Sequence, residues 1–413
     1  MQNQTAFGMF DRITSRPVRV TAGRFAVAIC SLVAVELSPD ERCARADVPK
    51  AELPTPSLPR RGGTLLPVPL VTSDSDNGVG FGAALAYYYG DGQTLPYRFG
   101  LVAQALFTTV GVSDDYLNLD WLRPFDSLFR VGLEIRYRRE PNASWFGAGN
   151  LSPKPPSVAA RYNQYGQQVP AARLLVQRPV AEHLALFCTY LAEYSIEETY
   201  AGSLLALTKP VGTSGGFNAP VGVGAAFDSR DSEVWTTRGQ YLELSLRDAT
   251  TWTGSRYRWQ GATATWRGFV PLPWQVVGAG RALVDGMRGG VPFYDLDSTG
   301  SLHEIDGLGG ANTMRGFVKD RFVGKGKVLL NGEFRRVFWD TSVIAHRVEF
   351  GGVTFADVGR VYGTSFSDGP TLLLHYDAGA GLRALIDREL VIRVDVGISI
   401  EGPRIYALFQ NMF

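Results

Sequence analysis

Apolar and polar residues alternate with a period of two along most of this chain. The pattern is clearest from Leu390 to Ile400, where apolar residues take every second position and Arg393 and Asp395 lie between them. Side chains at every second position of a strand share one face, so the pattern predicts strands with one apolar and one polar face. The polar faces carry charges of both signs, as at Glu134 and Arg136. Opposite charges on one face favour a barrel whose lumen holds paired charges over a soluble β-sandwich, whose polar face would meet bulk water.

Alternation and turn residues together predict about sixteen strands, an even number that fits a single-chain bacterial barrel. No stretch reaches the roughly 18 apolar residues that a membrane helix needs. The predicted fold is therefore all-β, a transmembrane antiparallel β-barrel spanning residues 64–413. A long loop between strands 11 and 12, roughly Arg288 to Val323, is expected to fold inward. The predicted strands are 64–72, 78–90, 97–111, 114–124, 128–140, 159–178, 181–195, 217–228, 238–249, 256–269, 273–287, 324–337, 347–361, 372–386, 390–401 and 403–413.

The first 46 residues have the features of a signal peptide. Four arginines precede an apolar run from Phe25 to Val35, and Ala44-Arg45-Ala46 provides a small-x-small cleavage pattern. We expect cleavage after residue 46; whether translation starts at Met1 or Met9 stays open. Cleavage would leave Cys188 as the one cysteine, so no internal disulfide is expected.

Residues 47–63 are rich in proline and predict an extended linker. About 17 residues are too few for a domain, since independent domains begin near 50 residues. The chain carries a net charge of +1 with no basic run, which argues against nucleic acid as a partner.

A glycine-rich segment with one arginine, GLGGANTMRGF at 307–317, precedes two predicted strands that carry acidic residues. Counting by two places Glu333 on the polar face of the first strand and puts Phe355 and Asp357 on one face of the next. Two neighbouring strands would thus each offer a carboxylate to one guanidinium. Arg315 is the candidate.

Three motifs, in this order, resemble a known family. The MRGF of 314–317, the NGEFR of 331–335 and the FADVGRVY of 355–362 are similar to the outer-membrane assembly and translocation barrels of the BamA/TamA type, also called bacterial surface antigens. Weaker similarities extend over about 350 residues, essentially the whole predicted barrel. The N-terminal POTRA domains of that family have no counterpart here.

The resemblance implies a specific loop lock. The Arg-Gly-Phe segment, here Arg315, Gly316 and Phe317, would lie on a loop folded into the barrel. By the same resemblance Glu333 and Asp357 would hold the guanidinium, with Phe355 beside it.

The function implied by the resemblance is insertion or translocation of polypeptide at the bacterial outer membrane, without catalytic residues. Its partners would be outer-membrane lipid, a polypeptide client and a separate periplasmic protein. Two alternatives remain: a passive pore for small solutes, and a structural or lipid-contacting barrel that works with a partner chain.

The first and last predicted strands would meet at a weak seam. Pro67 and Pro69 lack N–H groups and are two residues apart, so both would face the same neighbour, which we expect to be the last strand. Alternatively, the prolines merely begin the first strand. In the last strand Phe409 and Phe413 fall on one side, and Phe413 resembles the aromatic residue by which such barrels are recognised for insertion.

Other motifs do not predict chemistry. Gly212 to Gly216 matches G-x-S-x-G, but that motif needs a preceding strand and a following helix, whereas here a loop and a strand are expected. Asp228, Asp231 and Glu233 would suit Ca²⁺, yet they are read more simply as turn residues. We expect no metal, no cofactor and no enzymatic activity.

Overall fold

The computed structural model describes residues 61–94, 97–152, 161–302, 305–343, 346–363, 373–386, 388, 390–409 and 412–413. The predicted signal peptide and most of the predicted linker lie outside these residues. Among the described residues, no helix has both the length and the hydropathy to cross a bilayer.

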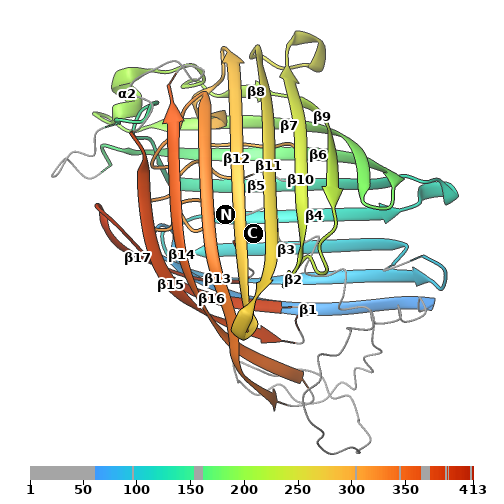
Figure 1. Cartoon of the computed structure of the whole chain (residues 1–413). Helices are drawn as coiled ribbons and strands as arrows, with labels where there is room; N and C mark the ends of the chain where they lie inside the picture. Colours follow the sequence, from blue (N-terminus) through green and yellow to red (C-terminus); the bar gives the residue numbers. More distant parts are fainter. Residues whose placement is uncertain are drawn as a thin grey trace, which may run out of the picture.

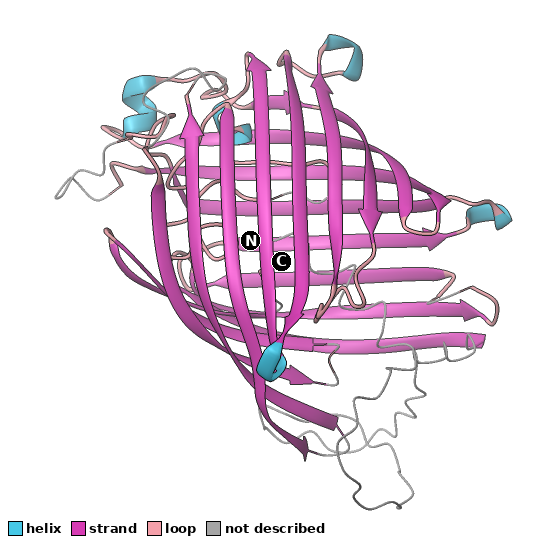
Figure 2. Cartoon of the chain, viewed as in Figure 1, coloured by secondary structure: helices cyan, strands magenta, loops and turns pink. Residues whose placement is uncertain are grey.

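The chain forms a closed antiparallel β-barrel of sixteen strands, which confirms the predicted fold (Figures 1 and 2). Seventeen segments are labelled because β8 and β9 are one strand, interrupted at Ala219 and Pro220; both pair with β7. The strands are β1 (Arg61–Asp74), β2 (Gly78–Asp91), β3 (Phe99–Thr108), β4 (Ser113–Leu122), β5 (Arg130–Ser144), β6 (Gln164–Ala181), β7 (Leu184–Thr199), β8 (Gly216–Asn218), β9 (Val221–Asp228), β10 (Gly239–Ala249), β11 (Trp259–Leu272), β12 (Val276–Gly289), β13 (Gly326–Val343), β14 (His346–Tyr362), β15 (His375–Ile386), β16 (Leu390–Ser399) and β17 (Gly402–Phe409).

The two faces of the sheet are reversed relative to a soluble protein. On β13 the apolar Leu330 and Phe334 are 52% and 62% exposed, whereas Glu333 and Arg335, at the alternate positions, are 2% and 1% exposed. In a closed sheet the buried polar face points into the lumen and the apolar face points outward. Exposed apolar bands around a polar interior are the arrangement of a transmembrane barrel.

The two ends of the barrel differ in their connections. Short connections such as 182–183 and 273–275 close one end, where β1 also begins and β17 ends. The other end carries the longer loops, among them 145–163 and 290–325. We call these the short-turn end and the long-loop end.

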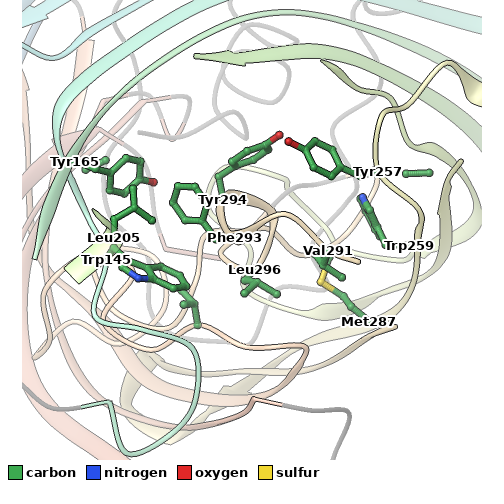
Figure 3. Packing of buried hydrophobic residues seen from close by; sticks show 13 residues of the cluster. Trp145, Tyr165, Leu205, Tyr257, Trp259, Met287, Val291, Phe293, Tyr294 and Leu296 are labelled. Atoms are coloured by element: carbon green, nitrogen blue, oxygen red, sulfur yellow. The ribbon is translucent and has the colours of Figure 1, made fainter. Parts of the chain in front are cut away.

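An aromatic cluster closes the long-loop end (Figure 3). Phe293 packs edge-on against Trp145 and Tyr165, with ring centroids 5.2 and 5.1 Å apart, and Tyr294 packs in the same way against Tyr257. The loop 290–325 contributes Phe293 and Tyr294, so this packing fixes the start of that loop. The short helix α2 (Leu204–Thr208) adds the buried Leu205.

Some boundaries differ from those predicted. Strand β1 begins at Arg61, so residues 61–63 belong to the barrel and not to the linker. Strand β17 ends at Phe409, four residues before the predicted end. The predicted strand at 217–228 contains a break, because Pro220 has no N–H to donate to a ladder.

Candidate functional site: loop anchor and seam

The segment before Arg315 is a compact turn that glycine makes possible. Gly309 and Gly310 have φ values of 122° and 93°, a region that side-chain-bearing residues rarely adopt. The Thr313 hydroxyl donates to the main-chain oxygen of Gly307 at 2.7 Å and accepts from the Gly309 N–H at 2.9 Å. This turn places Arg315 next to the polar faces of β13 and β14.

Arg315 makes the contacts expected from the sequence. Its Nε and Nη2 atoms donate to the two carboxylate oxygens of Asp357, each at 2.9 Å, and Nη1 donates to Glu333. The guanidinium carbon lies 3.4 Å from the centroid of the Phe355 ring. Two parallel bonds to one carboxylate form the most specific arginine contact, and here Arg315, Glu333 and Asp357 are all fully buried.

Further residues around Arg315 were not anticipated from the sequence. Asn331 donates from Nδ2 to Asp357 at 2.8 Å and to the Thr313 oxygen at 2.7 Å, so it joins β13 to the loop and to β14. Arg335 donates to Glu333 at 2.7 Å, and Asp395 lies 3.8 Å from the Arg315 guanidinium. Asn331 and Arg335 lie two residues on either side of Glu333, so strand periodicity placed them on its face but did not predict their contacts around Arg315.

Gly316 and Phe317 lie where the loop meets the barrel wall. A Cβ on Gly316 would lie 2.5 Å from the Cβ of Asp377 and 2.8 Å from that of Ser399, so no larger residue fits. The Ser399 hydroxyl donates to the Gly316 oxygen at 2.6 Å. Phe317 is 1% exposed and packs edge-on against Phe322 within the loop.

The same loop also contacts both strands of the seam, through Asp76 in the turn between β1 and β2. The Asp76 carboxylate accepts from the Lys319 main-chain N–H at 3.2 Å and from Arg404 of β17 at 2.8 Å. The Tyr406 hydroxyl lies 3.1 Å from both Asp76 and the main-chain oxygen of Phe317. No sequence pattern predicted this contact, because an aspartate in a turn is common.

Strands β1 and β17 share a short seam. Among the described residues, only Ser73 and Asp74 of β1 are paired with β17, opposite Ala407 and Tyr406, whereas β16 and β17 share eight pairs. The adjoining Ser75 donates its N–H to the Ile405 oxygen at 3.1 Å. The predicted seam residues Pro67 and Pro69 pair with Leu85 and Ala83 of β2 and lie outside the short stretch paired with β17.

Phe409 and Phe413 do not lie on one strand face as expected. Phe409 ends β17 opposite Ile392, whereas Phe413 lies against Phe269 of β11 and Arg335 of β13. Phe413 is 8% exposed. Its ring therefore packs against β11, β12 and β13, and not on a continued outward face of β17.

The other sequence motifs remain structural. The Gly212–Gly216 segment is a loop that ends at the first residue of β8. Asp231 accepts hydrogen bonds from the main-chain N–H groups of Thr237 and Arg238 within its turn. The described residues contain no group of three or more His, Cys, Asp or Glu arranged to hold a metal ion.

A family model, the Omp85 superfamily domain, matches residues 111–403, which is more than half of the chain. The chain belongs to the Omp85 superfamily. Omp85 barrels are bacterial outer-membrane proteins, and the superfamily contains the barrels that the three motifs resemble.

Solved Omp85 barrels share the fold of this chain. BamA from Haemophilus ducreyi lacking POTRA domains 1-3 superposes with a TM-score of 0.56 at 14% identity, covering 85% of this chain and 70% of that one. CdiB from Escherichia coli gives a TM-score of 0.56 at 12% identity, covering 84% of this chain and 62% of that one. Comparison with curated proteins finds no significant sequence match. At these identities the likeness concerns the fold alone.

Proposed function

We propose that this Omp85 barrel assists the insertion or translocation of polypeptide at the outer membrane through its β1–β17 seam. The observation that carries the proposal is the short pairing of that seam: within the described parts of β1 and β17 two pairs of residues join them, against eight between β16 and β17. The proposal involves no catalytic residue, and the client is a polypeptide that enters the bilayer beside the seam.

The physical basis is the strand edge that a short seam leaves. Backbone groups without a partner cost several kcal/mol each in hydrocarbon, so an incompletely paired β1 favours binding another strand. An extended client segment added to such an edge gains main-chain hydrogen bonds, as in other cases of β-strand addition. Pro67 and Pro69 reduce the donors on β1 but leave its carbonyl groups available, which keeps the seam weak without abolishing strand addition.

The second part of the proposal assigns the loop 290–325 the role of an internal lock. Arg315 ties the loop to β13 and β14, and the Lys319 and Phe317 main chains contact Asp76 and Tyr406 at the seam. A loop held at both places links the inner wall to the seam. Opening of the seam would then break the Asp76 contacts but leave the Arg315 contacts intact.

The space inside the barrel bears on the first alternative, a passive pore for small solutes. A cavity of about 140 Å³ lies between β5–β7 and the loop, lined by charged residues such as Arg138, Glu193, Asp297 and Lys319. About 10–15 Å³ of space open to the centre of a water molecule holds one water, so this cavity holds on the order of ten waters among its charged side chains. The second alternative is a structural or lipid-contacting barrel with a separate partner chain, and that partner would co-purify with the barrel.

The test is client insertion into vesicles that contain the purified protein. An unfolded small outer-membrane barrel is added, and its folding is followed by its heat-modifiable migration on a gel. We expect folding to be faster than in vesicles holding an equal amount of an unrelated sixteen-stranded porin. Equal rates in the two preparations, together with a steady open conductance in planar bilayers, would favour the passive pore.

A further inference from the structure

A pocket in the wall near the short-turn end holds the aromatic ring of Phe413. The ring lies against Phe269, with the centroids 6.4 Å apart, and the guanidinium carbons of Arg281 and Arg335 lie 5.2 and 5.1 Å from its centroid. Met412 and Ala279 complete this buried cluster. Guanidinium groups over an aromatic face attract it, most strongly when they are shielded from water, as Arg281 and Arg335 are.

The pocket also binds the main chain of its occupant. Nη2 of Arg335 donates to the main-chain oxygen of Phe413 at 2.9 Å, while Nε of the same guanidinium donates to Glu333. Nη1 of Arg335 is buried and has no hydrogen-bond partner among the described residues. Arg335 is 1% exposed, so an unused donor there is a place for a further acceptor.

The occupant comes from a distant part of the barrel. Strand β17 pairs with β16 and β1, whereas Phe269, Ala279 and Arg335 belong to β11, β12 and β13. Residues 412–413 therefore lie against another part of the wall than the strands that pair with β17 (Figure 1, mark C). If β17 continued in the register that pairs Ser73 with Ala407, Phe413 would lie opposite Pro67, which has no N–H to donate.

We propose that this pocket is a binding site for an extended peptide segment that carries an aromatic side chain. Residues 412–413 occupy it as an intramolecular ligand, and this occupancy holds the end of β17 away from β1. When residues 412–413 bind in the pocket, few main-chain hydrogen bonds to β1 are lost, because the opposing residues of β1 include Pro67 and Pro69, which have no N–H to donate. A peptide with the same residues competes for the pocket in trans. The proposal goes beyond the function proposed above, because binding of an aromatic peptide in this pocket does not require client insertion at the seam.

Cross-linking tests the occupancy and the competition. Ala279→Cys and Met412→Cys are combined in a Cys188→Ser background and treated with a short bifunctional thiol reagent, in detergent micelles. We expect rapid linkage that is about tenfold slower in the presence of excess peptide RIYALFQNMF, the sequence of residues 404–413. The same peptide with alanine in place of its last phenylalanine is the control and is expected to have no effect. The pair Ser73→Cys and Ala407→Cys, at the seam, is expected to link at the same rate with either peptide.

A second measurement uses the chain without engineered cysteines. A fluorescent form of the peptide is expected to bind the Phe413→Ala variant about tenfold more tightly than the unaltered protein, because the pocket is then vacant. Equal binding to the two proteins would overturn the proposal. So would equal competition by the phenylalanine and alanine peptides, or a 279–412 pair that fails to link in a protein that folds normally.

Discussion

The Asp76 carboxylate accepts a hydrogen bond from the Arg404 guanidinium at 2.8 Å, which joins the turn after β1 to the last strand. The same carboxylate accepts the main-chain N–H of Lys319 from the loop 290–325. One buried side chain thus holds together the two strands of the seam and the loop that Arg315 ties to β13 and β14. Few backbone pairs hold this seam, so side-chain contacts carry a large share of its stability.

Replacing Asp76 should loosen the seam while leaving the barrel folded. A hydrogen bond to a charged group contributes about 1.5–3 kcal/mol, so Asp76→Asn is expected to speed amide hydrogen exchange at Ser73 and Ala407 by about tenfold or more. The matched control is Asp126→Asn, which removes the exposed partner of Arg98. Unchanged exchange at the seam in Asp76→Asn would show that this carboxylate does not hold it.

Arg315→Ala should destabilise the barrel strongly. It leaves Glu333 and Asp357 buried without their main cation, and breaking a buried pair in this way costs about 3–5 kcal/mol. Arg315→Lys should recover part of the loss, since an ammonium keeps the charge but cannot make two parallel bonds to Asp357. The measurement is the urea midpoint of unfolding in detergent or lipid. The control is Arg178→Ala, at an exposed arginine, which should change the free energy of unfolding by no more than about 0.5 kcal/mol. An equal change in the two alanine variants would contradict a lock formed by Arg315.

Two glycine-to-alanine substitutions distinguish the effect of close packing at Gly316 from the general effect of adding a Cβ to the backbone. Gly316→Ala places a Cβ 2.5 Å from the side chain of Asp377 and should cost about 1–3 kcal/mol by overpacking. Gly332→Ala, on the neighbouring β13, adds a Cβ with no atom within 4 Å and should be neutral or slightly stabilising. Both variants are compared by the same unfolding midpoint. A Gly316→Ala protein as stable as Gly332→Ala would mean that the loop does not lie tightly on the wall.

The barrel was largely predictable from the sequence because lipid and lumen impose opposite polarities on successive residues. The period of two at 390–400 survives in the structure, with Val394 and Ile398 exposed and Asp395 fully buried. The same periodicity placed Glu333 and Asp357 correctly relative to each other. It also identified the acids that Arg315 meets, and Arg315 was the candidate because it is the one arginine of the glycine-rich segment before those strands.

The remaining features depend on contacts between residues far apart in the sequence. The alternation predicted a last strand that runs to Phe413, whereas the strand ends at Phe409. A pattern along one segment cannot reveal a pocket on β11–β13 that binds the aromatic ring. The alternation also missed the break at Pro220, although a proline within a strand was a usable signal. Asp76 was not singled out because its three partners come from a loop and the last strand, more than 240 residues away.

The most direct test of the account is to close the seam covalently and measure client insertion. Ser73→Cys and Ala407→Cys are linked, in a Cys188→Ser background, by a short thiol reagent that a reductant cleaves. The control pair is Leu244→Cys and Ala264→Cys, which are partners across β10 and β11. The account predicts that the seam link abolishes the acceleration of client folding in vesicles, that reduction restores it, and that the control link has no effect. A protein that stays fully active with its seam linked would contradict the account.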